Sequence, residues 1–203
     1  MTKLILALLL AANAQASLKI GDPLPESATK MKNTDGRELT LDELSKDKKG
    51  TLVVFSCNTC PYAKAWKDRI VEIGKDAEKR GLGVVMINSN DSVKYKGDDM
   101  ASMITAGIPF PYVVDATSNV ARSFGATKTP DVFLFGKDKK LVYKGAVDDN
   151  SDDPNGVKEH YLKTAVAQLL EGKPVKPAET KSVGCGIKFR EPVAAAGTTP
   201  KKK

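Results

Sequence analysis

Two cysteines three positions apart are the residues of this sequence most suited to chemistry. Cys57 and Cys60 lie in the stretch FSCNTCPYAK and are two of only three cysteines in 203 residues. Such a pair can be a redox couple, half of a metal site or an ordinary structural disulfide. Three cysteines do not make a disulfide framework, because one thiol is left over. The pattern therefore favours a functional site over a scaffold.

The segments on either side of the pair favour redox chemistry. The run TLVVFS before Cys57 is apolar and β-branched, as in a buried strand, and a helical pattern begins at Pro61. Cys57 would then face the positive end of a helix, which favours the thiolate and lowers the pKa of Cys57. We predict that Cys57 attacks a partner disulfide and that Cys60, the more buried thiol, resolves the mixed disulfide.

Two other readings of the cysteine pair stay open. A zinc site needs more ligands, and only Cys185 and His160, the one histidine, remain. A disulfide between residues three apart closes a very small loop and would stabilise the fold little. A metal-binding or carrier module that uses the pair with His160 or Cys185 is the alternative of a different class. His160 itself is expected to be a surface or packing residue.

Two further features could belong to the same site. Thr129-Pro130 opens a predicted strand, where proline is tolerated. Pro130 is either an ordinary trans proline or a cis proline whose preceding residue faces the dithiol and offers its backbone to a peptide. Cys185 stands between Gly184 and Gly186, which let a backbone pass close to another group. Its thiol could be a third redox thiol, a partner for another protein or a buried idle group.

The periodicity of the remaining chain predicts an α/β fold with a central mixed sheet flanked by helices. We expect an N-terminal hairpin over 31–41, strands over 51–56, 82–90, 112–116, 130–136 and 140–145, and helices over 61–80, 96–106, 118–125 and 155–170. The last two strands form a hairpin and are therefore antiparallel. The cysteine pair lies at the carboxyl end of a central strand, where ligands bind in such sheets.

The N-terminal segment has the pattern of a cleavable signal peptide. Lys3 is followed by an apolar run over 4–12 and by Ala14-Gln15-Ala16, a small-x-small cleavage pattern. The run is too short to cross a bilayer, although an uncleaved anchor or a buried helix is the alternative reading. We expect residues 1–16 to be removed and the chain to be periplasmic or secreted. This leaves one domain over 17–172 and a Pro-rich extension over 173–203, with a disordered basic tail at its end.

Charge excludes one class of partner. The formal net charge is +7, but basic residues alternate with acidic ones except at the terminal Lys201-Lys202-Lys203. A nucleic-acid-binding surface would gather Lys and Arg on one face with aromatic side chains for stacking. The sequence shows neither, so we expect no nucleic-acid partner.

The acidic loop between Asp148 and Glu159 is a candidate calcium-binding loop. Four side chains fall at calcium-loop positions: Asp148, Asn150, Asp152 and Glu159. The position that requires glycine for a sharp turn is Asp153, and no helix precedes the loop. We therefore favour a helix N-terminus rich in acidic residues, which suits the helix dipole.

Together these features resemble the thioredoxin superfamily over most of residues 20–172. Within it, the segments CNTCPYAK, NSND, YKGAVDDN and SVGCGIKFR resemble the exported peroxiredoxin-like or redoxin branch, which is related to thiol peroxidases. The resemblance implies a mixed sheet flanked by helices, with a cis Pro130 beside Cys57 and Cys60 and with Thr129 and Pro130 binding substrate. It implies a thiol–disulfide oxidoreductase that needs no cofactor, with protein disulfides or dithiols as substrates and a redox partner that recharges the pair.

The chain departs from two patterns of that superfamily. A peroxiredoxin carries Pro-x-x-x-Thr-x-x-Cys at its peroxide-attacking cysteine. If Cys60 were the peroxide-attacking cysteine, Val53 would stand at the proline position and Cys57 at the threonine position. If it were Cys57, Gly50 and Val54 would stand there. A thiol-dependent peroxidase is the rival function of the same class, and the missing proline and threonine count against it. No acid lies between Thr51 and Cys60, so the buried carboxylate of thioredoxin is not apparent there.

Overall fold

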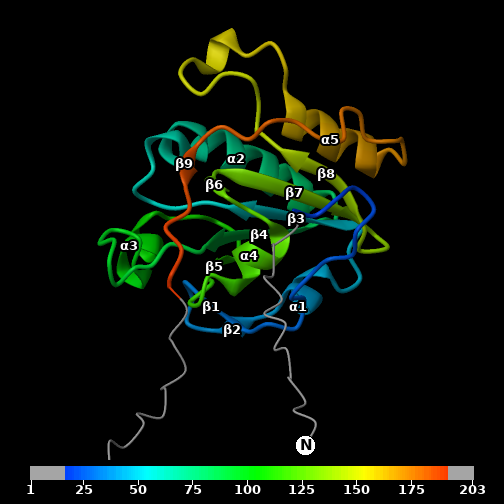
Figure 1. The fold of residues 1–203 in the computed structure, drawn as a ribbon. Coiled ribbons are helices and arrows are strands. Elements are labelled where there is room, and N and C mark those ends of the chain that lie inside the picture. Colours follow the sequence, from blue (N-terminus) through cyan, green and yellow to red (C-terminus); the bar gives the residue numbers. More distant parts are fainter. Residues whose placement is uncertain (1–16, 192–203) are drawn as a thin grey trace, which may run out of the picture.

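A seven-stranded mixed sheet forms the centre of the protein, and helices cover both of its faces (Figure 1). The structure, a computed structural model, describes residues 17–191, so the predicted signal peptide and the basic tail lie outside the described residues. The strand order is β2-β1-β5-β4-β3-β7-β8. The strands are β1 Met31–Asn33, β2 Glu38–Leu39, β3 Gly50–Phe55, β4 Gly83–Asn88, β5 Tyr112–Val114, β7 Asp131–Gly136 and β8 Leu141–Gly145.

Strand pairing confirms the predicted mixed sheet. β3 runs parallel to β4, and β4 runs parallel to β5. On its other side β3 is antiparallel to β7, which forms the expected hairpin with β8. The N-terminal hairpin of β1 and β2 joins the sheet through β5. β3 is therefore a central strand with partners on both sides, and its end is the place where the two cysteines begin.

Side chains of β3 alternate between two apolar layers, as the geometry of a strand requires. Leu52 and Val54 pack in the layer that contains α2 (Pro61–Lys79), α3 (Met100–Thr105) and α5 (Tyr161–Leu170). Val53 and Phe55 pack in the opposite layer, with α1 (Leu41–Ser45) and α4 (Asn119–Phe124). All six residues of β3 are buried, which explains its continuous apolar sequence.

The last helix is shorter than its sequence pattern predicts. It begins at Tyr161 instead of 155, and a single 3-10 turn, η1 (Pro154–Gly156), precedes it. The side chain of Asn150 accepts the N–H groups of Asp152 and Asp153, both at 3.0 Å, and that of Asp153 accepts the N–H of Asn155 at 2.9 Å. Such local bonds compete with helix formation, so the acidic loop stays outside the helix.

The C-terminal extension returns to the domain. After α5 the chain runs beside β8, where the N–H of Thr180 donates to the carbonyl oxygen of Lys144 and the N–H of Lys144 donates to that of Ala178, both at 3.0 Å. It then forms β9 (Cys185–Gly186), which pairs with β6 (Lys128–Thr129) in a separate two-stranded sheet (Figure 1). Among residues 17–191, no helix combines the length and the apolar character needed to cross a bilayer.

Candidate active site

Both cysteines of the pair lie where the sequence predicted them. Cys57 follows the end of β3, and Cys60 is the N-cap residue of α2, whose first residue is Pro61. Proline suits that position because the first N–H groups of a helix have no partner within the helix. Cys57 is 6% exposed and Cys60 4% exposed, so both thiols are close to the surface but largely covered. All three cysteines are free thiols in the structure.

Thr129 lies against both sulfur atoms. Its hydroxyl is 3.3 Å from the Sγ of Cys57, and its carbonyl oxygen accepts a hydrogen bond from the Sγ of Cys60 at 3.1 Å. The peptide bond between Thr129 and Pro130 is cis, as the resemblance implied. The structure thus gathers Cys57, Cys60, Thr129 and Pro130, four residues chosen from the sequence, into one site.

The pKa shifts of the two thiols reverse the expectation that the pKa of Cys57 is lowered, since the pKa of Cys57 is raised and that of Cys60 is lowered. A hydrogen bond from the Cys57 thiol lowers the pKa of Cys60 to about 4. Burial acts against this shift, and a hydrogen bond with the Cys185 thiol adds to it. The hydrogen bond to Cys60 and burial raise the pKa of Cys57. The physical reason is the direction of the hydrogen bond between the two thiols, which stabilises the thiolate on Cys60, its acceptor, and the proton on Cys57, its donor.

The proton of the pair has an acceptable place on either sulfur. When it is on Cys57, the Cys60 thiolate accepts its hydrogen bond. When it is on Cys60, that thiol donates to the Thr129 carbonyl, and the Thr129 hydroxyl can donate to a Cys57 thiolate. The pair therefore titrates as a unit.

A buried carboxylate that the sequence did not reveal holds the loop between the cysteines. Asp98 is 1% exposed and accepts hydrogen bonds from the backbone N–H groups of Asn58 at 2.7 Å and Thr59 at 3.3 Å. It also accepts the Thr59 hydroxyl at 2.7 Å and the side-chain amide of Asn90 at 2.8 Å. Four donors on one carboxylate fix the conformation of the two residues that separate the sulfurs.

Two more side chains support this loop from the neighbouring strands. The side-chain amide of Asn88, the last residue of β4, donates to the backbone oxygen of Asp98 at 3.1 Å. The hydroxyl of Tyr112, the first residue of β5, donates to the side-chain oxygen of Asn58 at 3.1 Å. The polar stretch NSND is therefore part of the support for the dithiol. Its signal in the sequence was a group of polar residues directly after a buried strand.

Cys185 also reaches the site, from the far end of the chain. It packs against the cluster formed by Cys57, Cys60 and Ala63, and it is opposite Thr129 in the β6–β9 pair. Gly184 lies so close to Thr129 that an added Cβ would collide with the Thr129 carbonyl oxygen. The glycine next to the cysteine does allow a close backbone approach, as the sequence suggested.

His160 and the acidic loop lie elsewhere. His160 is the N-cap residue of α5 and lines a hollow with Arg69 and Asp148. The carboxylate of Asp148 contacts the Arg69 guanidinium at 2.5 Å, so an arginine already provides its positive partner. Within residues 17–191, no group of three or more Cys, His, Asp or Glu side chains is arranged to hold a metal ion.

A small hollow opens beside Cys57. It has a volume of about 240 Å³ and is lined mainly by apolar groups, among them Met86, Ile108 and Tyr112, with Lys64 and Lys67 also present. Cys57 is the member of the cysteine pair that lines this hollow, whereas Cys60 faces Thr129 and Cys185. An external molecule that enters here would meet Cys57 first.

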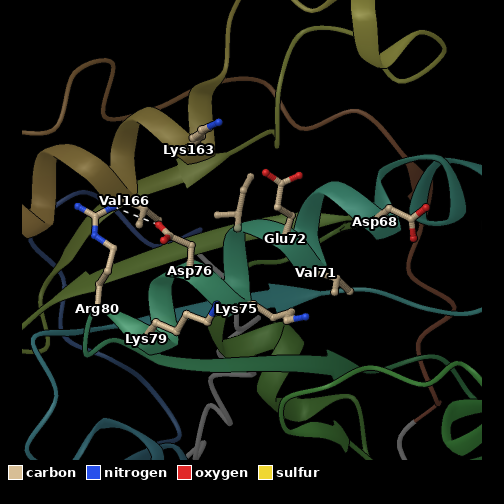
Figure 2. Close-up of a pocket in the computed structure, with 10 residues that line it drawn as sticks. Asp68, Val71, Glu72, Lys75, Asp76, Lys79, Arg80, Lys163 and Val166 are labelled. Carbon is tan, nitrogen blue, oxygen red and sulfur yellow. Dashed lines mark hydrogen bonds and ion pairs between the residues drawn. The ribbon is translucent and has the colours of Figure 1, made fainter.

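A larger hollow of about 650 Å³ lies on the outer side of α2, and no cysteine lines it (Figure 2). Its walls carry charges of both signs, including Glu72, Lys75 and Lys163. Asp76 and Arg80 form an ion pair across one turn of the helix at 3.2 Å. These side chains resemble a solvated helix surface, so we place the candidate active site at the cysteines.

Comparison with known proteins supports the fold and the family. A family model described as Redoxin matches residues 19–160. An uncharacterized conserved protein from Geobacillus kaustophilus is 33% identical, with a TM-score of 0.79, over 86% of this chain and 94% of that one. A hypothetical protein from Sinorhizobium meliloti is 32% identical, with a TM-score of 0.78, over 90% of this chain and 98% of that one.

A more distant structure shows the shared fold. The thioredoxin domain of a thiol-disulfide oxidoreductase from Bacteroides vulgatus is 17% identical, with a TM-score of 0.53, over 63% of this chain and 89% of that one. No curated protein matches the sequence. The predicted thioredoxin-like fold is confirmed.

Proposed function

Since the chain belongs to the Redoxin family, we propose that it is a thiol–disulfide oxidoreductase whose Cys57–Cys60 pair alternates between dithiol and disulfide. The observation that carries the proposal is the meeting of both sulfurs at Thr129, 3.3 Å and 3.1 Å from its hydroxyl and carbonyl oxygens. Both thiols are covered and share a proton, which keeps one of them ready as a thiolate.

Cys57 is the thiol that attacks the substrate in this mechanism. It lines the hollow. Because the pKa of Cys57 is raised and that of Cys60 is lowered, the Cys57 proton must first move to Cys60, whose thiol then donates to the Thr129 carbonyl oxygen. The Cys57 thiolate attacks one sulfur of a substrate disulfide, that bond breaks, and the first substrate thiolate leaves. Cys60 next gives up its proton and attacks the Cys57 sulfur, which releases the second substrate thiolate. Two electrons pass to the substrate, and the reverse sequence oxidises a substrate dithiol.

Protein disulfides or dithiols are the proposed substrates, and a second thiol–disulfide protein would recharge the pair. The edge of β6 beside the sulfurs supports this choice, because an extended peptide can pair with such an edge once it displaces β9, which pairs there in the structure. The signal-like pattern over 1–16 supports export to the periplasm or beyond. Cell fractionation and N-terminal sequencing test the location, and a mature chain that begins at Ser17 is the expected result.

A thiol peroxidase is the second candidate within the same chemistry. Around Cys60, Val53 and Cys57 stand where the proline and threonine of a peroxiredoxin would be, and around Cys57, Gly50 and Val54 stand there. The proline and threonine that orient peroxide in that pattern are therefore absent around either cysteine. Peroxide consumption that disappears in Cys57→Ser would establish this activity, and we expect it to be slow.

The reduction potential of the pair tests the proposed function. The mature protein is equilibrated with glutathione buffers, its thiols are trapped, and the disulfides are identified by mass spectrometry. We expect a Cys57–Cys60 disulfide; a potential near about −230 mV would make the protein a reductant, and one near about −120 mV an oxidant. If the two sulfurs never pair across the series, the proposal is wrong and metal analysis follows.

Trapping tests the roles of the two thiols. Cys60→Ser should accumulate mixed disulfides between Cys57 and substrate proteins, because the resolving thiol is absent. Cys57→Ser, which lacks the attacking thiol, should accumulate few mixed disulfides. Equal trapping by both variants would contradict the assignment of Cys57 as the attacking thiol.

A further inference from the structure

We propose that Cys185 is a third redox-active thiol of this site, held against Cys60 by a strand of the protein's own extension that occupies the edge of β6. The inference rests on the proposed function of the Cys57–Cys60 pair. Three observations carry it: the pairing of β9 with β6, the anchors on both sides of Cys185, and the contact of Cys185 with the other two cysteines.

β9 lies at an edge where an extended peptide could pair. β6 has two residues, lies outside the main sheet, and has β9 paired along its edge. In the register of the pair, Cys185 is opposite Thr129, whose carbonyl oxygen contacts Cys60 at 3.1 Å. A peptide that paired with this edge would place a side chain at the dithiol, and here that side chain is a thiol.

Anchors on both sides of Cys185 show that the strand is built into the fold. Before it, the hydroxyl of Ser182 donates to the buried carboxylate of Asp131 at 2.5 Å. After it, Ile187 is buried in the core, and its N–H donates to the carbonyl oxygen of Thr127 at 3.0 Å. These contacts limit the freedom of Cys185, so its sulfur stays at a high local concentration near Cys60.

Further anchors hold the end of the segment. The N–H of Lys188 donates to the side-chain oxygen of Asn90 at 2.8 Å, and the N–H of Arg190 donates to the hydroxyl of Ser118 at 2.9 Å. Asn90 also donates to Asp98, the carboxylate that holds the loop between the cysteines. The segment that carries Cys185 and the loop that carries Cys57 and Cys60 therefore share a side chain.

The chemical step is an exchange within the protein. The Cys185 thiol loses its proton and attacks the Cys60 sulfur of the Cys57–Cys60 disulfide. The Cys57–Cys60 bond breaks, a Cys60–Cys185 bond forms, and Cys57 leaves as a thiolate that can take up the proton from Cys185. The number of disulfides does not change, so the step needs no external oxidant or reductant.

The exchange has two consequences for the site. It fixes β9 on the edge of β6, which keeps a substrate peptide from pairing there. It also releases Cys57 as a free thiol beside the hollow while the protein remains oxidised. A protein substrate must displace β9 to use this edge, so the extension competes with protein substrates in either redox state.

Oxidation of Cys57→Ser tests the inference directly. With oxidised glutathione, Cys60 first forms a mixed disulfide, and Cys185 then displaces the glutathione thiolate. We expect an intramolecular Cys60–Cys185 disulfide, identified by mass spectrometry of the monomer after peptide digestion without reduction. The matched variant Cys60→Ser should instead remain glutathionylated at Cys57, because the thiol with which Cys185 forms a hydrogen bond is that of Cys60.

Two glycines in the same segment provide a matched pair of controls in the Cys57→Ser background. Gly184→Ala pushes β9 away, since its added Cβ would meet the Thr129 carbonyl oxygen. The Cβ of Gly186→Ala would come no closer than 4.0 Å to the Thr127 carbonyl oxygen. We expect Gly184→Ala to lower the rate of Cys60–Cys185 formation at least about tenfold, the equivalent of about 1.4 kcal/mol. Gly186→Ala should leave the rate unchanged.

The outcomes separate this inference from the proposed function. The inference would be overturned if Cys57→Ser stayed glutathionylated at Cys60. If wild type still formed the Cys57–Cys60 disulfide, the proposed function would remain intact. Disulfides between Cys185 residues of two molecules, or equal rates in the two glycine variants, would also overturn it. Failure of Cys57 and Cys60 to pair in wild type at any potential would refute the CxxC couple and the exchange that starts from it, even if a Cys60–Cys185 bond formed.

Discussion

Asp98 holds Thr59 by two hydrogen bonds, one from the hydroxyl at 2.7 Å and one from the backbone N–H at 3.3 Å. The two residues are far apart in the sequence, yet this contact sets the path of the chain between Cys57 and Cys60. A carboxylate can accept several hydrogen bonds at once, and here it receives four. We interpret Asp98 as a positioning residue for the dithiol.

Asp98→Asn should loosen this loop without changing its size. The asparagine keeps one acceptor oxygen and turns an amide toward donors, so buried N–H groups lose their partner. We expect the free energy of unfolding to fall by about 1–3 kcal/mol, measured by urea denaturation of the reduced protein. The reduction potential of the pair should also shift. Asp99→Asn is the matched control, because asparagine caps α3 as well as aspartate does; equal stability of the two variants would contradict the role of Asp98.

The pKa of Cys60 should depend on the group at position 57. The first cause of the lowered pKa of Cys60, about 4, is the hydrogen bond from the Cys57 thiol. Cys57→Ala removes this donor and should raise the pKa of Cys60, whereas Cys57→Ser keeps a hydroxyl donor and should raise it less. The ultraviolet absorbance of the thiolate as a function of pH, with Cys185→Ser in both variants, measures the difference. Identical titrations of the two variants would show that the pair does not share a proton in this way.

Local signals in the sequence were enough to place the dithiol. The spacing of Cys57 and Cys60, the buried run before them and Pro61 after them all belong to one short segment, and each depends on strand or helix geometry alone. Thr129 and Pro130 were also singled out from the sequence, and family resemblance added the cis peptide bond beside the cysteines. The fold class followed in the same way from periodicity, and the boundaries of β3 and α2 differ from the prediction by one residue at most.

Contacts between segments that are distant in the chain could not be predicted from the sequence. Asp98 falls in the helix predicted over 96–106. Only the path of the chain from β4 to α3 brings its carboxylate into contact with the loop between the cysteines. The glycines beside Cys185 predicted a close approach but not its partner, which is Thr129 on β6. The start of α5 was misplaced because side chains of the acidic loop bind its backbone, a competition that helical periodicity does not register.

Asp131 should make the stability of the protein depend on pH. Burial raises the pKa of this carboxyl from its ordinary value of 3.8, against hydrogen bonds from Ser182 and from the backbone at Thr127 and Lys128. A raised folded-state pKa means that its favourable contribution is complete below pH 3.8 and declines as the pH rises through the folded-state pKa. Asp131→Asn should remove this decline, so the stability of wild type minus that of the variant should fall between pH 4 and neutral pH. Urea unfolding over a pH series measures it.

The exposed turn residue Asp138 provides the control for this pH dependence. Asp138→Asn also removes one carboxylate from the same hairpin, but its side chain is exposed and accepts only the N–H of Lys140 at 3.1 Å. It should leave the pH profile of stability unchanged. Parallel profiles for wild type and Asp131→Asn would show that the buried carboxyl does not titrate in this range.

A buried ion pair behind the active site should contribute to stability far more than an exposed one on the same helix. Asp148 accepts a hydrogen bond from the indole of Trp66 at 2.7 Å and contacts the guanidinium of Arg69 at 2.5 Å. The Asp148 side chain is 3% exposed and that of Arg69 is 16% exposed. Asp148→Asn leaves the arginine without its counter-charge, so we expect a loss of about 3 kcal/mol in urea unfolding.

The control is the ion pair between Asp76 and Arg80, which lies on the exposed side of α2 (Figure 2). Its side chains are 59% and 39% exposed, so Asp76→Asn should cost at most about 0.5 kcal/mol.

The coupling between Arg69 and Asp148 is measured by the double variant Arg69→Met with Asp148→Asn, which should lose less stability than the sum of the single variants. Addition of calcium should not raise the melting temperature of wild type, because Asp148 is already paired. Strict additivity, or stabilisation by calcium, would show that the carboxylate serves a different partner.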